Sequence, residues 1–391
     1  MDFHQFANPV EIPLDMHEPL KKNVFDLFFG KIGLNKIGLD ALFTYLGRYY
    51  ERRLELRPWK PREIPEGACL LDFHCHTSLS DGEGTFESIL ARLSRSKALD
   101  GIAFTNHPWY HGPDGKERIR NDKVVKQSYD AFEIVEKMKK KGQLPGHFLT
   151  FPGSAEFAPK GTYEFPKKGV ELIGIGLPKT FVEDNDGMQK LRNLFAEELT
   201  EKIQDAGGLA ILPHPFYFEP GGLSRTLWKK VDAVEAINQT TQVFVEPIIR
   251  EFAKKSKIDI PLVQNVFAVQ TLFGYFGWRN RIELRKYPRP MVGSSDAHIE
   301  PFVGSACTMF DEPIDDLESL RYALKREKGK PIMNPRWEDH NDLDDIIDSV
   351  WHHWGREIIQ GITNIHQKRR GLVPVLKILT GLLRIIRKRW D

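Results

Sequence analysis

From residue 66 onward, short apolar segments alternate with longer amphipathic segments, and this alternation constrains the fold more than any other feature of the chain. The apolar runs of strand length lie at 68–73, 101–105, 147–151, 170–176, 209–212, 232–237 and 290–293. Helical patterns separate most of them, at 85–97, 122–141, 186–206 and 241–255. Short apolar strands that alternate with helices are typical of parallel βα units. We therefore expect an α/β fold in which seven strands form a barrel.

Residues that can bind a metal follow five of these strands. In chain order they are His74, His107, Glu156, His214, Asp296 and His298. In a barrel of parallel strands the functional side chains lie on the loops that follow the strands. His74 and His76 also share one face of an extended segment. An isolated pair of this kind is equally compatible with solvated loop histidines. Because the chain has only 13 histidines, their placement after the strands indicates one metal-binding rim.

Composition excludes several classes of protein. With 391 residues and a formal net charge of +2, the chain has ample material for a core and no general attraction to nucleic acid or membrane. Its three cysteines do not make a disulfide framework, which indicates a reducing compartment. The first residues lack the pattern of a secretion signal, and no apolar run of about 18 residues is present. We therefore expect a cytoplasmic protein.

The sequence divides into three parts. Residues 1–65 form a helical N-terminal extension, 66–335 the barrel domain and 336–391 a helical C-terminal extension. An aromatic-rich insertion at 257–290 serves as packing or as a lid. The tail at 368–391 has the pattern of a basic amphipathic helix. Such a helix either docks on the barrel or on another subunit, which we favour, or lies on an anionic membrane as a peripheral contact.

Five motifs carry a resemblance to a known family. They are His74-Cys75-His76 with Ser80-Asp81-Gly82, Thr105-Asn106-His107, Gly153-Ser154-Ala155-Glu156, Pro213-His214-Pro215 and Ser295-Asp296-Ala297-His298. Their order and spacing resemble the PHP superfamily, the polymerase and histidinol phosphatase domain, over about residues 66–330. The segment 234–238 agrees with this pattern. The resemblance implies a distorted (β/α)7 TIM-like barrel that holds two or three divalent metal ions.

The resemblance also implies which residues bind these ions. His74, His76, Glu156 and Asp296 match the ligands of one ion, which would hold the metal-bound water that attacks the substrate. Glu156 would bridge to a second ion, which His214 also binds. A third ion would be held by Asp81, His107 and His298. The mixture of imidazole and carboxylate suits zinc, manganese or iron. Cys75 would face the core.

Two positions depart from the family pattern. Asn106 stands where the family usually has aspartate, and its amide is expected to support a neighbouring ligand from outside the metal shell. Glu171 stands where the family commonly has histidine. Glu171 is either an extra ligand of the second ion, which would shift the preference toward manganese or magnesium, or a carboxylate paired with Lys167 or Lys168. Both interpretations stay open.

Members of the family hydrolyse phosphoesters, so the resemblance implies a metal-dependent phosphoesterase, either a phosphatase or a phosphodiesterase. Its substrate would be a small phosphorylated metabolite, a nucleotide or an oligonucleotide end. The alternative is a non-catalytic PHP-like metal-binding module that acts in protein or membrane-surface interaction. The eight matching ligand positions favour the enzyme. The candidates for binding the substrate are His111, Arg118, Arg120, Lys123, Lys160 and Arg225. Each of these cations is also compatible with a solvated surface.

Overall fold

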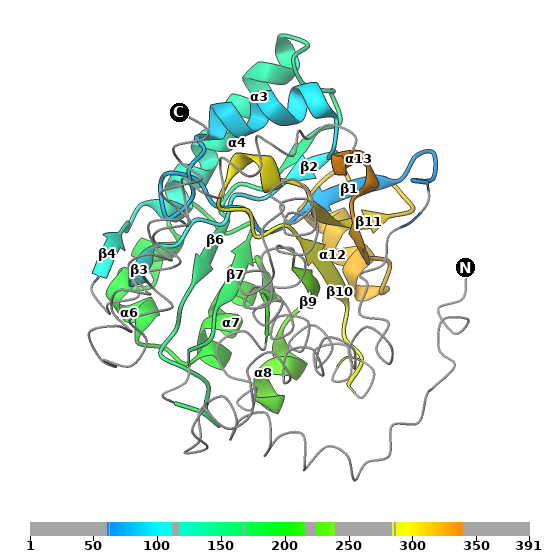
Figure 1. Ribbon diagram of the computed structural model, residues 1–391. Coiled ribbons are helices and arrows are strands. Elements are labelled where there is room, and N and C mark those ends of the chain that lie inside the picture. Colours follow the sequence, from blue (N-terminus) through cyan, green and yellow to red (C-terminus); the bar gives the residue numbers. More distant parts are fainter. Residues whose placement is uncertain are drawn as a thin grey trace, which may run out of the picture.

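A computed structural model describes Pro61, 63–111, 117–166, 169–215, 224–238, Leu284 and 287–338 (Figure 1). The predicted extensions at 1–65 and 336–391, the insertion at 257–290, the helix at 241–255 and the tail at 368–391 lie wholly or mostly outside these residues.

The first sheet has the strand order β12-β11-β1-β2-β5. Its strands are β12 (Lys330–Met333), β11 (Ala306–Phe310), β1 (Cys69–Asp72), β2 (Gly101–Ile102) and β5 (Leu149–Thr150). The pairs β1–β2 and β2–β5 are parallel, as expected for βα units. β11 runs antiparallel to both β1 and β12, and this hairpin was not predicted.

The second sheet has the order β10-β9-β8-β7-β6. Its strands are β10 (Met291–Ser294), β9 (Ala233–Asn238), β8 (Leu209–Leu212), β7 (Leu172–Ile175) and β6 (Ala155–Phe157). β8, β9 and β10 are mutually parallel, but β7 is antiparallel to both of its neighbours. All seven predicted strands are present. The expectation that all of them run parallel was wrong for the segment 170–176.

The described strands form no closed barrel but two five-stranded sheets and one two-stranded sheet, β3–β4 (Trp109–His111 and Glu117–Arg120). The mixed α/β class is therefore confirmed and the closed ring is not. The two large sheets meet through backbone contacts beyond their strand ends. The amide of Asp296 donates to the carbonyl of His74 over 2.8 Å, and the amide of His76 donates to the carbonyl of Ala297 over 2.9 Å. Apolar side chains from both sheets, among them Phe73 and Ile211, form one buried cluster. This core therefore ties the two sheets together.

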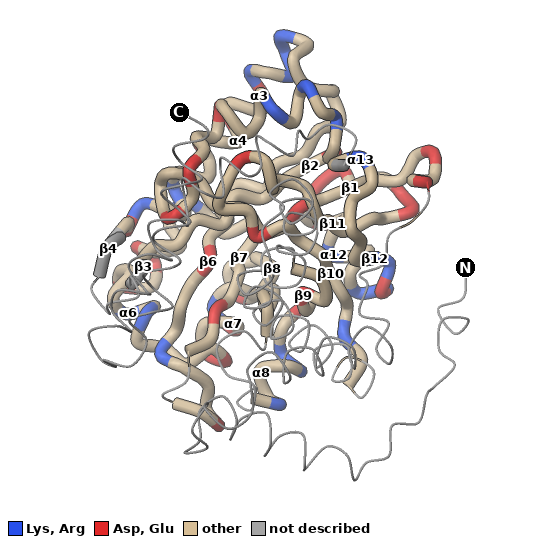
Figure 2. The backbone as a smooth tube through the Cα atoms, in the orientation of Figure 1, with Lys and Arg blue, Asp and Glu red and all other residues tan. Residues whose placement is uncertain are grey.

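Helices cover the outside of the sheets. α3 (Phe86–Ser96) and α4 (Val124–Lys140) follow β1 and the β3–β4 hairpin. α3 begins at a capping box on Thr85. The other helices are α5 (Phe181–Asp184), α6 (Met188–Arg192), α7 (Ala196–Asp205), α8 (Arg225–Lys230), η3 (Glu300–Phe302), α12 (Leu317–Lys325) and α13 (Pro335–Glu338). Lysines and arginines mark outer helices such as α3 and α8, whereas the central strands carry few charges (Figure 2).

The single helix expected at 186–206 is two helices, α6 and α7. The amide of Phe195 donates to the carboxylate of Glu198 over 2.7 Å, which caps a new helix start. The carbonyl of Leu194 accepts from the amide of Lys160 over 3.0 Å. These contacts take the backbone between the helices out of the helical hydrogen-bond pattern. None of the described helices is long and apolar enough to cross a membrane.

Candidate metal centre

Nine imidazole and carboxylate side chains converge where the strands of the two sheets end. They are the eight predicted ligands His74, His76, Asp81, His107, Glu156, His214, Asp296 and His298, together with Glu171. Their ligand atoms form overlapping groups in which the atoms lie within 4.8 Å of one another. Residues that are far apart along the chain therefore meet at one place, as the position of the motifs after the strands predicts. Their roles as metal ligands stay a prediction.

The first group contains His74, His76, Glu156 and Asp296. The Nε2 atom of His74 lies 3.0 Å from Nε2 of His76 and 3.0 Å from Oε2 of Glu156. The Nε2 atom of His76 lies 3.2 Å from the same oxygen of Glu156. Oδ1 of Asp296 lies 3.3 Å from both imidazole nitrogens. Ligand atoms about 2.0–2.1 Å from a tetrahedral ion lie about 3.3 Å apart. The four donors are thus spaced to surround one ion.

A second group shares Glu156. Its Oε1 atom is buried without a hydrogen-bond partner and lies 3.3 Å from Nε2 of His214. Oε2 of Glu171 lies 3.5 Å from the same nitrogen of His214. Glu156 therefore presents one oxygen to each of two groups, which is the arrangement of a bridging carboxylate.

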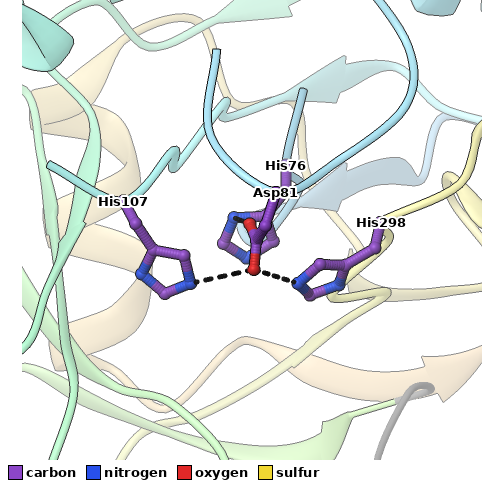
Figure 3. Close-up of side chains that lie close together, drawn as sticks. All are labelled: His76, Asp81, His107 and His298. Carbon is purple, nitrogen blue, oxygen red and sulfur yellow. Dashed lines mark hydrogen bonds and ion pairs between the residues drawn. The ribbon is translucent and has the colours of Figure 1, made fainter. Parts of the chain in front are cut away.

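The third group gathers around Asp81 (Figure 3). Oδ2 of Asp81 lies 3.2 Å from Nε2 of His298 and 3.8 Å from Nε2 of His107. Oδ1 lies 3.5 Å from Nδ1 of His76. The ring of His76 stacks on the rings of His107 and His298, with centroids 4.6 and 4.3 Å apart. This group is the richest in imidazole.

Glu171 reaches the centre because β7 is reversed. The residues that precede a parallel strand lie at the opposite end of the sheet from the residues that follow it. β7 is antiparallel to β6 and β8, so its beginning lies beside their ends. Glu171 immediately precedes β7. The same reversal that contradicts an all-parallel barrel thus brings a ninth carboxyl or imidazole group to the rim.

Two of these residues have strained backbones. The φ angles are +23° at His214 and +51° at Asp296, in the left-handed region that side chains other than glycine seldom occupy. Such strain persists only where the surroundings hold it, and it clusters at functional sites. The amide of His214 donates to Oε2 of Glu235 over 2.8 Å, and the amide of Asp296 donates to the carbonyl of His74. These contacts hold both residues in place.

Glu235 is a fully buried support that the sequence placed in the segment 234–238 without assigning it a role. Its Oε1 atom lies 3.2 Å from Nδ1 of His74. Its Oε2 atom accepts from the amide of His214 and, over 2.7 Å, from the side chain of Asn238. Asn238 donates in turn to Oδ2 of Asp296 over 3.1 Å. A carboxylate on the far nitrogen of a ligating histidine fixes the tautomer that leaves Nε2 free to bind.

Asp72 links the two sheets beneath the centre. Its buried carboxylate accepts from the amide and hydroxyl of Ser295 over 3.0 and 2.5 Å, and from the amide of Gly304 over 3.1 Å. Burial raises the pKa of Asp72 to about 6, although these hydrogen bonds oppose the shift. Asp72 therefore fixes the segment that carries Asp296. Sequence reasoning missed it because a single aspartate at the end of an apolar strand has no distinctive pattern.

Asn106 supports the loop that follows His76. Its Oδ1 atom accepts from the amide of Thr77 over 2.7 Å and from the hydroxyl of Ser80 over 2.9 Å. Asp81 follows directly. Asn106 thus contacts the backbone and side chains of this loop, and its predicted support of a ligating imidazole stays a prediction.

Opposite charges shift the pKa values across the centre. Burial alone would lower the pKa of His298, but Asp81 and Asp296 outweigh it and raise that pKa to about 10. Burial would also lower the pKa of His214, but the carboxylates of Glu156 and Glu171 outweigh this effect and raise that pKa to about 9. The pKa of Glu171 rises to about 7 because it is buried beside Glu156. The carboxylates of the centre therefore favour positive charge on these imidazoles.

The predicted substrate residues are placed only in part. His111, Arg118 and Arg120 lie on the β3–β4 hairpin, and their side chains lie outside the described part of the structure. The guanidinium group of Arg225 lies 5.4 Å from the ring centroid of Tyr287. The other two cations lie elsewhere: Lys123 immediately precedes α4, and the ammonium of Lys160 lies 4.4 Å from the ring centroid of Phe195. Their roles stay predictions.

A family model described as PHP-associated matches residues 279–328. This segment includes Asp296 and His298. The similarity to a PHP-associated segment therefore covers this part of the chain. A comparison with curated proteins found no match.

Several solved structures are weakly similar to this chain. One is a two-domain protein of Bacteroides vulgatus that contains a predicted PHP-like metal-dependent phosphoesterase, with 14% identity and a TM-score of 0.39 over 71% of this chain and 69% of that one. PsfC from Pseudomonas syringae has 14% identity and a TM-score of 0.39 over 74% and 99%. Endonuclease Q, in complex with a duplex that carries an abasic lesion, has 14% identity and a TM-score of 0.35 over 68% and 58%. Likenesses at this level do not establish an activity.

Proposed function

We propose that this chain is a metal-dependent hydrolase of phosphoesters. The observation that carries the proposal is the first group, in which Nε2 of His74 and Nε2 of His76 lie 3.0–3.3 Å from each other and from the carboxylate oxygens of two distant segments. Imidazoles and carboxylates in this mixture suit zinc, manganese or iron. Divalent ions bound to such a cluster supply Lewis acidity, which activates a water and neutralises the charge of a phosphate group.

The burial of the centre gives it an inner and an outer side. The side chains of His74 and Glu156 are at most 1% exposed, whereas those of Asp81, Glu171 and His298 are 15–17% exposed. The phosphate group would therefore approach from the side of the latter three. The inner residues exclude water and hold the donors in a fixed arrangement.

No protein nucleophile is needed for this proposal. Cys75 lies between two of the histidines, but it is fully buried. Burial raises the pKa of its thiol well above the usual value, so it does not form the reactive thiolate. We infer that water is the attacking group. The described cysteines are free and buried, which supports the proposed cytoplasmic location.

The substrate class follows from charge and from the family. We propose a small phosphorylated metabolite, a nucleotide or an oligonucleotide end, because the net charge of +2 does not support a long groove for a polyanion. The two or three ions would be zinc, manganese or iron. Contact of the tail 368–391 with a membrane or a subunit stays a prediction.

Hydrolysis of a chromogenic phosphomonoester and phosphodiester, with added manganese or zinc, tests the proposal. Asp296→Ala removes a donor from the first group and should abolish turnover. Asp186→Ala is the matched control because Asp186 also has a left-handed backbone, with φ +59°, and is exposed. Turnover by the wild type no faster than by Asp296→Ala, with both substrates and both metals, would refute the enzyme. It would favour the non-catalytic metal-binding module.

A further inference from the structure

The three groups of the centre differ in their donor atoms. The group of Glu156, Glu171 and His214 offers two carboxylates and one imidazole. The group around Asp81 offers a single carboxylate with the imidazoles of His76, His107 and His298. Oxygen ligands suit magnesium and manganese, whereas imidazole suits zinc and iron. The centre therefore has an oxygen-rich position and an imidazole-rich position side by side.

Glu171 decides this difference. Without its carboxylate, the second group would retain one carboxylate and one imidazole. The register places Glu171 firmly in the group, because Glu156 on β6 lies opposite Ile173 on β7. Glu171 lies two residues before Ile173, so its side chain extends from the same face of the strand. Its Oε2 atom is 3.5 Å from Nε2 of His214.

A buried carboxylate oxygen that lacks a hydrogen bond points to a ligand at this position. Oε1 of Glu156 is shielded from solvent and has no hydrogen-bond partner. Buried carboxylate oxygens are normally satisfied by a donor or a cation. This oxygen faces His214, which is also the neighbour of Glu171. A cation among the three residues would satisfy it. Lys167 and Lys168, the alternative partners for Glu171, lie outside the described residues.

We propose that Glu171 makes the second position selective for a hard divalent cation, manganese or magnesium, beside a position that takes zinc or iron. The centre would then hold two kinds of metal in fixed places. The inference rests on the proposed function, since it assumes that the cluster binds metal, and it deepens that function by assigning metal preference to one residue.

The experiment uses the full chain, stripped of metal with a chelator. The protein is loaded with manganese, zinc is titrated in, and the bound manganese is followed by electron paramagnetic resonance together with total metal content. Glu171→His replaces the oxygen donor by imidazole. It should lower the zinc concentration that displaces manganese by at least about tenfold, the scale on which changed partners alter metal affinity. Glu171→Gln should lose the protected manganese signal. Glu133→His, at an exposed position on α4, should behave as the wild type.

The outcomes separate the two proposals. If the wild type binds no metal, both the proposed function and this inference fail. If it binds metal and hydrolyses phosphoesters, but Glu171→His and Glu171→Gln release manganese at the same zinc concentration as the wild type, only the inference fails. Circular dichroism and the retention of zinc show whether each variant has folded. If Glu171→His does not fold, the manganese signal of Glu171→Gln decides alone.

Discussion

Replacing Glu235 by glutamine should weaken metal binding without removing any proposed ligand. In the wild type, one oxygen of Glu235 lies 3.2 Å from Nδ1 of His74. The other accepts from the amide of His214 and from the side chain of Asn238, over 2.8 and 2.7 Å. Glutamine keeps an oxygen for these two donors, which places its NH₂ group against His74. A donor then faces Nδ1, whereas in the wild type the carboxylate accepts a hydrogen bond from this nitrogen.

His74 can respond to this donor in two ways, and each of them weakens the binding of a metal ion. If the proton stays on Nδ1, two donors face each other in a site where neither is solvated, at a cost of about 1–3 kcal/mol. If the proton moves to Nε2, this nitrogen can donate to Oε2 of Glu156, which lies 3.0 Å away, but it can no longer bind a metal. Because about 1.4 kcal/mol corresponds to tenfold in affinity, we expect the metal Kd to rise about 10–100-fold, as for other partners of ligating histidines.

Competition with a chromogenic chelator measures this Kd, and thermal unfolding of the metal-free protein serves as the check on folding. Glu197→Gln is the matched control. Glu197 is also fully buried, and it accepts from the hydroxyl of Ser224 over 2.7 Å and from the amide of Tyr163 over 3.1 Å, with none of the proposed ligands among these donors. It should lose stability and keep its metal affinity. If Glu235→Gln kept the Kd of the wild type, the assigned tautomer of His74 would be wrong.

Two further predictions concern the loop and the protons of the centre. A Cβ at Gly82 would lie 2.6 Å from the backbone carbon of His76, so Gly82→Ala should shift the Asp81 loop, lower the stability by about 1–3 kcal/mol and weaken metal binding. The control is Gly146→Ala, whose Cβ would meet nothing within 4 Å, and it should leave the unfolding temperature and the metal Kd unchanged. Equal effects of the two substitutions would contradict the steric argument. The pKa values of about 9 at His214 and about 10 at His298 exceed the unfolded value of about 6.5, so the stabilisation they give the metal-free protein is complete below about pH 6.5 and is lost as the pH rises through about 9–10. Thermal unfolding from pH 6 to 10 should therefore show a steeper loss for metal-free than for metal-loaded protein, and parallel curves would count against it.

The local patterns of the sequence predicted the elements better than their connections. Each of the seven apolar runs contains a strand whose residues are mostly buried, and 209–212 matches β8 to the residue. The helix patterns at 85–97 and 122–141 correspond to α3 and α4. The pattern at 186–206 predicted one helix where the structure has α6 and α7. The hydrogen bonds of Lys160 and Glu198 that separate these helices involve backbone groups. Apolar periodicity does not report such contacts.

Strand direction was the main property that the sequence did not reveal. An apolar run that is buried on both faces reads the same in either direction, so nothing in 170–176 distinguishes a parallel strand from an antiparallel one. The supports of the centre were equally hidden. Glu235 was visible only as part of a motif, and Asp72 has no pattern of its own, because their partners lie up to 232 residues away. By contrast, the ligand positions could be predicted because each follows an apolar run, although Glu156 itself lies within the short strand β6.

The reversed strand explains why the rule that places functional residues after strands succeeded and yet was incomplete. The rule is a statement about one edge of a sheet. The five segments that it used are parallel strands, namely β1, β2, β5, β8 and β10. β7 crosses the same edge in the opposite sense, so the residue that it contributes must precede the strand. Glu171 is that residue. A rule that considers the residues at both ends of each apolar run would have included Glu171 among the candidates for this edge of the sheet.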